Sequence, residues 1–175
     1  TSLKTLALKT PAHWKWESEN PVHKDVFDLG AAIHSIVLER DETNIVEVDA
    51  DSWRTKEART AKEQAHKDGK VPLLTKDLEL ARAIDRSIMA HPLASRMLTG
   101  HKAEQSVFWE EDGLMLKCRP DALNLGLIAD LKSIITADPN TFGKTAADLG
   151  YFMSAAHYQD SMKTITDEQM PFLFI

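Results

Sequence analysis

Leu127-Ile128-Ala129-Asp130-Leu131-Lys132 is a short apolar run that ends in an acid, one leucine and a lysine. Its length and its aliphatic residues predict a buried β-strand. Residues two apart on a strand point to the same face, so we expect Asp130 and Lys132 on one side and Ala129 and Leu131 on the other. The stretch therefore predicts a strand that presents a carboxylate and an amine together.

A second acid precedes this strand. The segments 104–109 and 114–119 read as two strands joined by a turn that contains Asp112-Gly113, and Asp121 follows the second of them. A hairpin can bring Asp121 beside Asp130. Two carboxylates at one spot repel each other unless a cation lies between them, and Mg²⁺ is the usual cation.

This acid, acid and lysine pattern suits hydrolysis of a phosphodiester. Lys132 would orient or deprotonate the attacking water, or neutralise the charge that develops on phosphorus. We expect Mn²⁺ to substitute for Mg²⁺, because the expected ligands are oxygen atoms. The alternative is an exposed Asp130–Lys132 ion pair on an edge strand, worth less than about 1 kcal/mol. A similar triplet, Asp68-Gly69-Lys70, lies in a glycine-containing loop and reads as solvated surface.

The rest of the chain reads as helices before this sheet and a helix and a strand after it. The fold class is α/β (mixed α+β), with a central mixed sheet flanked by helices. We expect a helix after Asn20-Pro21, with one apolar face formed by Val22, Val26, Leu29 and Ile33. Two further helices follow caps at Asp51 and Thr75. Two more run from Pro92 to Gly100 and from Asn140 to Lys163, and the last strand contains Phe172.

Composition fits one domain over residues 1–175. The chain is 43% hydrophobic and has no apolar run long enough for a membrane span. Its one cysteine, Cys118, excludes a cysteine-built zinc site, and we expect a reducing, cytoplasmic protein. The net charge of −6 argues mildly against a generic nucleic-acid binder, less so if the acids hold cations. The apolar end, 171–175, favours a chain truncated at its C-terminus.

Seven segments resemble, in the same order, the exonuclease domain of the RecE family. This is a branch of the PD-(D/E)xK nucleases, with the restriction-endonuclease-like core, that also contains lambda exonuclease and the RecB nuclease domain. The matching segments are Gly30-Ala31-Ala32-Ile33-His34, Trp53-Arg54-Thr55-Lys56-Glu57-Ala58-Arg59, Gly69-Lys70-Val71-Pro72-Leu73-Leu74, His91-Pro92-Leu93-Ala94, Glu104-Gln105-Ser106-Val107-Phe108-Trp109, Lys117-Cys118-Arg119-Pro120-Asp121 and Ala129-Asp130-Leu131-Lys132-Ser133.

The resemblance implies roles for single residues. Asp121 and Asp130 resemble the family's metal ligands, and Lys132 resembles its catalytic lysine. Glu104 resembles an acid that helps to hold or position a metal, and His34 resembles a histidine that approaches the metal from a helix. Without the resemblance, Glu104 would read as a solvated strand end and His34 as a core or boundary histidine.

The family also has a Gln-x-x-x-Tyr motif on the helix after the catalytic strand. Tyr158 matches its tyrosine, but Ser154 stands at the glutamine position, which leaves the contact made by that glutamine in doubt. Gln159 is close in sequence but lies one residue round the helix from Tyr158, so it is a poor substitute.

Two groups of basic residues are candidates for DNA contact. Arg119 alternates with Lys117 on its strand, so it can face the site and contact phosphate. The second group lies on the predicted helix after Asp51, where acids are interleaved with it, so a phosphate-contacting ridge and an ion-paired helix face both fit. Its members are Arg54, Lys56, Arg59 and Lys62.

The resemblance further implies a 5′-to-3′ double-strand DNA exonuclease, a ring-shaped homo-oligomer around DNA, and work beside a single-strand annealing protein in phage or prophage recombination. One alternative is an endonuclease or nickase on the same core. Another is a non-cleaving DNA-binding or assembly module, although the complete set of Asp121, Asp130 and Lys132 argues against it.

Overall fold

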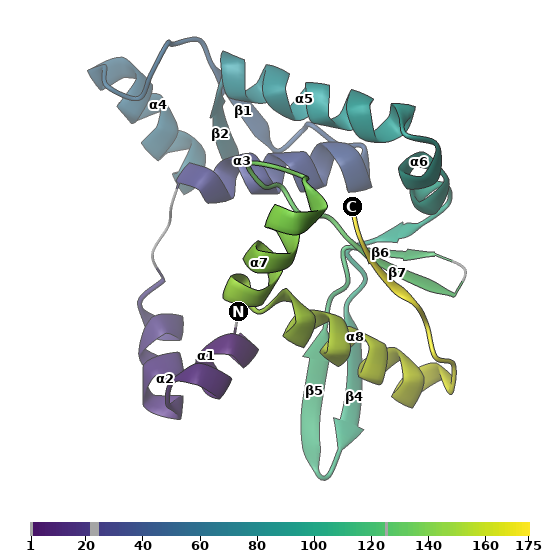
Figure 1. Cartoon of the computed structure of the whole chain (residues 1–175). Coiled ribbons are helices and arrows are strands. Elements are labelled where there is room, and N and C mark those ends of the chain that lie inside the picture. Colours follow the sequence, from purple (N-terminus) through teal and green to yellow (C-terminus); the bar gives the residue numbers. More distant parts are fainter. Residues whose placement is uncertain (1, 22–24, 125) are drawn as a thin grey trace. The chain divides into compact units, whose positions relative to one another are not determined.

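The computed structural model describes residues 2–21, 25–124 and 126–175, which form two compact units. One unit is Lys24–Ala103, and the other joins Thr1–His23 to Glu104–Ile175 (Figure 1). Within the described ranges, no helix combines the length and the apolarity that crossing a membrane requires.

Lys24–Ala103 contains a small parallel βαβ arrangement. The strands β1 (Ile45–Val48) and β2 (Val71–Leu74) pair in parallel, and α4 (Lys56–Lys67) connects them. The prediction of an all-helical first half was wrong here. Each strand has only four residues, and β2 contains a proline, so neither shows the alternation that identifies a strand in sequence.

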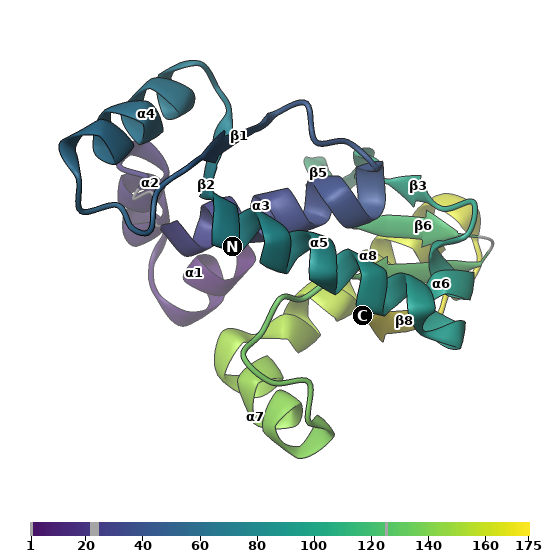
Figure 2. The same ribbon diagram turned by 90° about the horizontal axis from the view of Figure 1, so that it is seen from above.

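Helices cover this pair of strands. The helix α3 (Asp25–His34), continued by the wider-turned η1 (Ser35–Glu39), lies beside α5 (Thr75–Ala90) (Figure 2). The predicted apolar face is confirmed at Ile33, which is buried, and at Leu29, which is half-buried; Val22 and the side chain of Val26 lie outside what the structure describes. The short α6 (Pro92–Leu98) and β3 (Lys102–Ala103) complete the unit, and α6 begins at Pro92 as predicted.

Two predicted helix caps were wrong. The helix α4 begins later than Asp51 implied, because the Thr55 side chain accepts a hydrogen bond from the Ala58 N–H (3.2 Å). Thr75 is the first residue of α5 and not its cap, which leaves Leu74 at the cap position without a side-chain bond.

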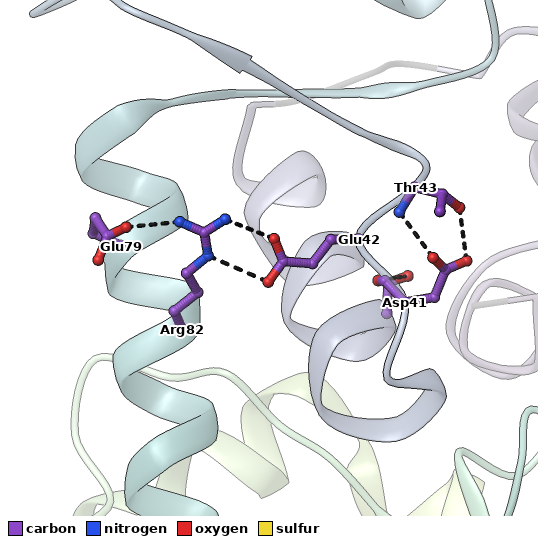
Figure 3. Close-up of polar contacts among 6 residues, drawn as sticks. Asp41, Glu42, Thr43, Glu79 and Arg82 are labelled. Atoms are coloured by element: carbon purple, nitrogen blue, oxygen red, sulfur yellow. Dashed lines mark hydrogen bonds and ion pairs between the residues drawn. The ribbon is translucent and has the colours of Figure 1, made fainter.

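A cluster of charged side chains ties the loop before β1 to α5 (Figure 3). Arg82 donates to both carboxylate oxygens of Glu42 (2.7 and 3.2 Å) and to Glu79 (2.8 Å). In the same loop, Asp41 accepts hydrogen bonds from the backbone N–H and the hydroxyl of Thr43 (2.8 and 2.9 Å). These bonds lower the pKa of the Asp41 carboxyl below its ordinary value.

The second unit contains the predicted hairpin. The strands β4 (Val107–Glu111) and β5 (Leu114–Cys118) pair antiparallel. The turn residues Asp112 and Gly113 have φ values of 50° and 76°, as a two-residue type I′ turn requires.

A mixed sheet follows the hairpin. The strands β6 (Ala122–Asn124) and β7 (Leu127–Asp130) pair antiparallel, and β8 (Phe172–Phe174) joins β7 in parallel. The strand β6 is not among the strands that the sequence predicts, because it spans only three residues next to Gly126. The strand predicted at 127–132 is confirmed over Leu127–Asp130, the strand at Phe172 is confirmed, and so is the mixed fold class.

Four helices belong to this unit, α1 (Ser2–Leu8), α2 (Pro11–Glu19), α7 (Pro139–Leu149) and α8 (Tyr151–Thr166), among the residues described. The expected single helix from Asn140 to Lys163 was wrong. Gly150, at a φ of 68°, ends α7 in the left-handed conformation that glycine adopts easily, and α8 starts at the next residue.

Candidate active site

The Asp130–Lys132 segment is held extended by the end of the chain. The Ile175 N–H donates to the Asp130 carbonyl (3.0 Å), and the Lys132 N–H donates to the Ile175 carbonyl (2.9 Å). These bonds continue the parallel pairing of β7 with β8 past the last residue of β7. Asp130 and Lys132 therefore lie on one face, as the sequence predicts.

The β6–β7 hairpin brings Asp121 to this segment. Ala122 pairs with Ala129, and the Leu131 N–H donates to Asp121 Oδ2 (2.8 Å). Asp121 is itself buried. The prediction that a hairpin places Asp121 beside the strand of Asp130 is confirmed, but that hairpin includes a strand, β6, that the sequence did not reveal.

Lys132 is shared by the two carboxylates. Its Nζ forms an ion pair with Asp130 Oδ2 and lies 3.9 Å from Asp121 Oδ2. The same Nζ lies 5.3 Å from the centre of the Tyr151 ring, within the range of a cation–π contact. One amine thus faces two buried acids.

Asp130 is under-satisfied in this arrangement. The residue is 2% exposed, and its Oδ2 accepts no hydrogen bond from any described residue, although the Lys132 ammonium is within ion-pair range. A buried carboxylate oxygen without a hydrogen bond is costly. Such an oxygen is suited to a ligand that the protein itself does not supply.

Glu104 adds a third carboxylate. It has a φ of 50°, a left-handed conformation that is uncommon for a residue with a side chain. Its N–H donates to the Asp121 carbonyl (3.0 Å), and carboxylate oxygens of Glu104 and Asp121 lie within 4.8 Å of each other. Residues in sparsely populated backbone conformations concentrate at functional sites.

Arg119 offsets part of the negative charge of Glu104. Its Nε lies 2.9 Å from Glu104 Oε2, while the rest of its side chain is largely exposed. Arg119 therefore reaches the acidic group from the solvent side. This is the position in which its guanidinium could also meet a phosphate.

The acids form a set of oxygen donors that fits a hard cation. Mg²⁺ and Mn²⁺ prefer carboxylate oxygen and water, and Mg²⁺ is usually bound through one or two carboxylates together with water and phosphate. Glu104, Asp121 and Asp130 offer such oxygens, with Asp130 Oδ2 lacking a hydrogen bond in the described part of the chain. The residues present therefore fit a divalent metal.

Two tyrosines of α8 border the site, and sequence reasoning found only one. The pKa of Tyr158 is raised, first by burial and then by the charges of Asp130 and Asp121, so its phenol is close to both acids. Tyr151 lies under Lys132. It is seven residues before Tyr158, a spacing that puts both on one side of a helix and that could have identified it.

The structure also places Ser154, which stands at the family's glutamine position, and the nearby Gln159. Ser154 is one turn before Tyr158 on α8. The side-chain N–H of Gln159 donates to the Met170 carbonyl (2.9 Å), so this amide is engaged with the loop before β8. Gln159 therefore does not replace the missing glutamine in this arrangement.

The remaining predicted site residues belong to the unit Lys24–Ala103. His34 is the last residue of α3 and is half-buried. Three basic residues are exposed before and within α4, and none of them forms an ion pair with residues 25–124 or the other described parts; they are Arg54, Lys56 and Arg59. The nearby Lys62 lies 4.8 Å from the centre of the Trp53 ring.

Comparison with known proteins supports this interpretation of the fold. No curated protein matches the chain. A crystal structure described as a "Putative exonuclease" from Eubacterium rectale matches with a TM-score of 0.61 and 17% sequence identity. The match covers 93% of this chain and 59% of that one, so the chain spans less than two thirds of its structural neighbour. At this identity the likeness concerns the fold.

A family model matches almost the whole sequence. It covers residues 2–175 and is described as "PDDEXK-like domain of unknown function (DUF3799)". In this chain the sheet brings two acids and one lysine together, Asp121, Asp130 and Lys132. The resemblance to the PD-(D/E)xK nucleases is thereby confirmed, and the chain belongs to the family of PDDEXK-like domains.

Proposed function

We propose that this chain is a metal-dependent deoxyribonuclease whose residues 1–175 act as one nuclease domain. The observation that carries the proposal is the convergence of Asp121, just before β6, with Asp130 and Lys132 at the end of β7. Nothing in a purely structural ion pair requires two buried acids around one lysine, and removing one acid would lower the desolvation cost.

The proposed cofactor is Mg²⁺, with Mn²⁺ able to replace it. Asp121 and Asp130 would hold the metal, Glu104 would hold or position it, and His34 would supply a further ligand, as the family resemblance implies. The metal, when bound, polarises the scissile phosphate and makes a bound water a better nucleophile.

The side chains of the protein would handle the phosphate and the water. Hydrolysis forms a bond between the water oxygen and phosphorus and breaks one phosphorus–oxygen ester bond. Lys132, ion-paired with Asp130, would orient or deprotonate the attacking water, or neutralise the charge that develops on the phosphate. Arg119, exposed beside Glu104, would bind a neighbouring phosphate.

The substrate that we propose is linear double-stranded DNA, digested from 5′ to 3′ in recombination of the phage or prophage type. The family resemblance supports this choice, and the structural neighbour is described as a "Putative exonuclease". The proposal extends to a single-strand annealing protein as partner and to a cytoplasmic location. Arg54, Lys56 and Arg59 are exposed and offer a strip for DNA phosphates.

Assembly into a ring is part of the proposal. The chain has 21 Lys and Arg against 27 Asp and Glu, so the net field of one subunit does not attract DNA. A ring of three or four copies would enclose the duplex and combine the few basic residues that each subunit offers to DNA. Sedimentation should show a trimer or tetramer, and a monomer at working concentration would remove the ring.

A digest of two DNA forms tests the activity. With Mg²⁺, linear duplex should be degraded and covalently closed circles spared. Cutting of intact circles would instead favour an endonuclease or nickase on the same core. Binding without cleavage of either form would favour a DNA-binding module.

A further inference from the structure

A pocket of about 570 Å³ lies beside the β4–β5 hairpin, within the unit that contains the candidate active site. This is the size range of pockets that bind small organic groups. Its walls come from the hairpin, from α8 and from Trp14 of α2. Several of its lining residues are aromatic or basic: Trp14, Phe108, Lys117, Arg119, His157 and Tyr158.

Two aromatic residues that line this pocket are exposed, Phe108 and Trp14. Phe108 is 62% exposed, so its ring is accessible to a ligand. His157 is held in place, because its ring lies 5.3 Å from that of Trp109 and its Nε2 is 3.4 Å from the Lys117 carbonyl. Rigid rings with open faces are suited to stacking on flat ligands.

Positive charge lies next to these rings. Lys117 stands opposite Phe108 in the hairpin register, and both side chains are exposed. Arg119 follows two residues later along the chain, past the end of β5. Phe108, Lys117 and Arg119 thus bring one ring and two cations to the lining of the pocket, a combination that suits a single nucleic-acid strand, where bases stack and phosphates meet the basic groups.

The pocket is continuous with the candidate active site. Arg119 lines the pocket and also contacts Glu104, and Glu104 lies beside Asp121. Tyr158 lines the pocket too, and the charges of Asp130 and Asp121 help to raise the pKa of its phenol. A strand with one phosphate at the acids would therefore extend its next nucleotides towards the pocket.

We propose that this pocket binds an unpaired nucleobase of the DNA strand whose phosphate lies at the site of Asp121, Asp130 and Lys132. Bases in a duplex are paired and stacked, so only an unpaired base can offer its face to Phe108 and Trp14. The inference rests on the proposed nuclease function and adds to it that the cut strand is single-stranded beside the scissile bond.

Binding of short oligonucleotides tests this inference. Fluorescence anisotropy would compare a labelled oligothymidylate with an abasic deoxyribose-phosphate strand of equal length, in EDTA and at low salt. Stacking of one base contributes enough to predict that wild type binds the oligothymidylate about five-fold or more tightly. Equal affinity for the two strands, or no measurable binding of either, would overturn the inference.

Matched variants localise the effect. Phe108→Ala should weaken oligothymidylate binding about five-fold or more and leave abasic binding unchanged. Leu114→Ala is the control, because Leu114 is 64% exposed on the same hairpin and is not among the described residues that line the pocket. Trp14→Ala and Trp16→Ala form a second pair on α2. Equal losses in a variant and its control would reject the pocket.

The two proposals can fail separately. Base-dependent binding without any cleavage of DNA in Mg²⁺ would reject the nuclease function and keep the pocket as a DNA-binding site. Cleavage of linear DNA by a protein that binds abasic and thymidylate strands equally would reject the pocket alone. Melting curves of the variants should match wild type, since the removed side chains are exposed or at the surface of the pocket.

Discussion

Asp130→Asn separates a metal-binding acid from a structural one. The substitution keeps the size of the side chain and removes its charge. Asp130 is 2% exposed, and its Oδ2 receives no hydrogen bond from the described residues. If this oxygen holds a cation, Mg²⁺ will stabilise the wild-type protein and not the variant.

The size of this effect follows from linkage. A ligand present at about 100 times its Kd stabilises the folded state by about 2.7 kcal/mol. For a chain of 175 residues, each kcal/mol shifts the Tm by about 2–4 °C. Saturating Mg²⁺ should therefore raise the wild-type Tm by about 5–11 °C relative to EDTA.

Thermal melting followed by circular dichroism measures this rise. Asp130→Asn should show little or none of it, whereas Glu42→Gln, which changes an acid in the other unit, should keep it in full. The Tm in EDTA is less diagnostic, because Lys132 loses its nearest partner while the burial cost of Asp130 disappears. A Mg²⁺-induced rise in Asp130→Asn equal to that of wild type would refute the assignment.

Four other predictions concern Lys132, His34, the buried residue Ile128 and the ion pair of Arg82 with Glu42. Lys132→Ala should abolish cleavage and leave the circular dichroism spectrum intact, and a parallel loss of folding would mark a structural pair instead. His34→Ala should lower cleavage strongly but less than Asp130→Asn in the same digest. Ile128→Ala, at a 0% exposed position of β7, should lower the free energy of unfolding by about 2–5 kcal/mol in a denaturant titration. Arg82 lowers the pKa of Glu42 below its ordinary value, so the bond between them stabilises the fold at pH values above that ordinary pKa. Arg82→Ala should therefore have a lower Tm than wild type at neutral pH. The difference in Tm should shrink as the pH falls through the lowered pKa of Glu42.

The elements with a local signal were predictable from the sequence. The hairpin turn at Asp112-Gly113 specifies its own geometry, and an apolar run identifies β7. The short strands β1, β2 and β6 carry no such signal, because a glutamate interrupts the apolar residues of β1, β2 contains a proline, and β6 has only three residues. They exist because a neighbouring strand supplies their hydrogen bonds, and the sequence of one segment does not contain that information.

In the candidate site, too, some residues could be predicted from the sequence and others could not. The spacing of Asp130 and Lys132 places both on one face of a strand, and the ion pair between them agrees. Asp121 reaches them through β6, and Tyr151 reaches Lys132 because Gly150 ends α7 and starts a new helix. The break at Gly150 could not be read from a helical pattern that continues across it.

The most direct measurement of the central claim is the rate at which linear duplex DNA is degraded in Mg²⁺, in EDTA, and by Lys132→Ala in Mg²⁺. We expect the wild-type protein to release nucleotides in Mg²⁺, with no release in EDTA and none by the variant. Full activity that survives EDTA, or that survives the loss of Lys132, would contradict it.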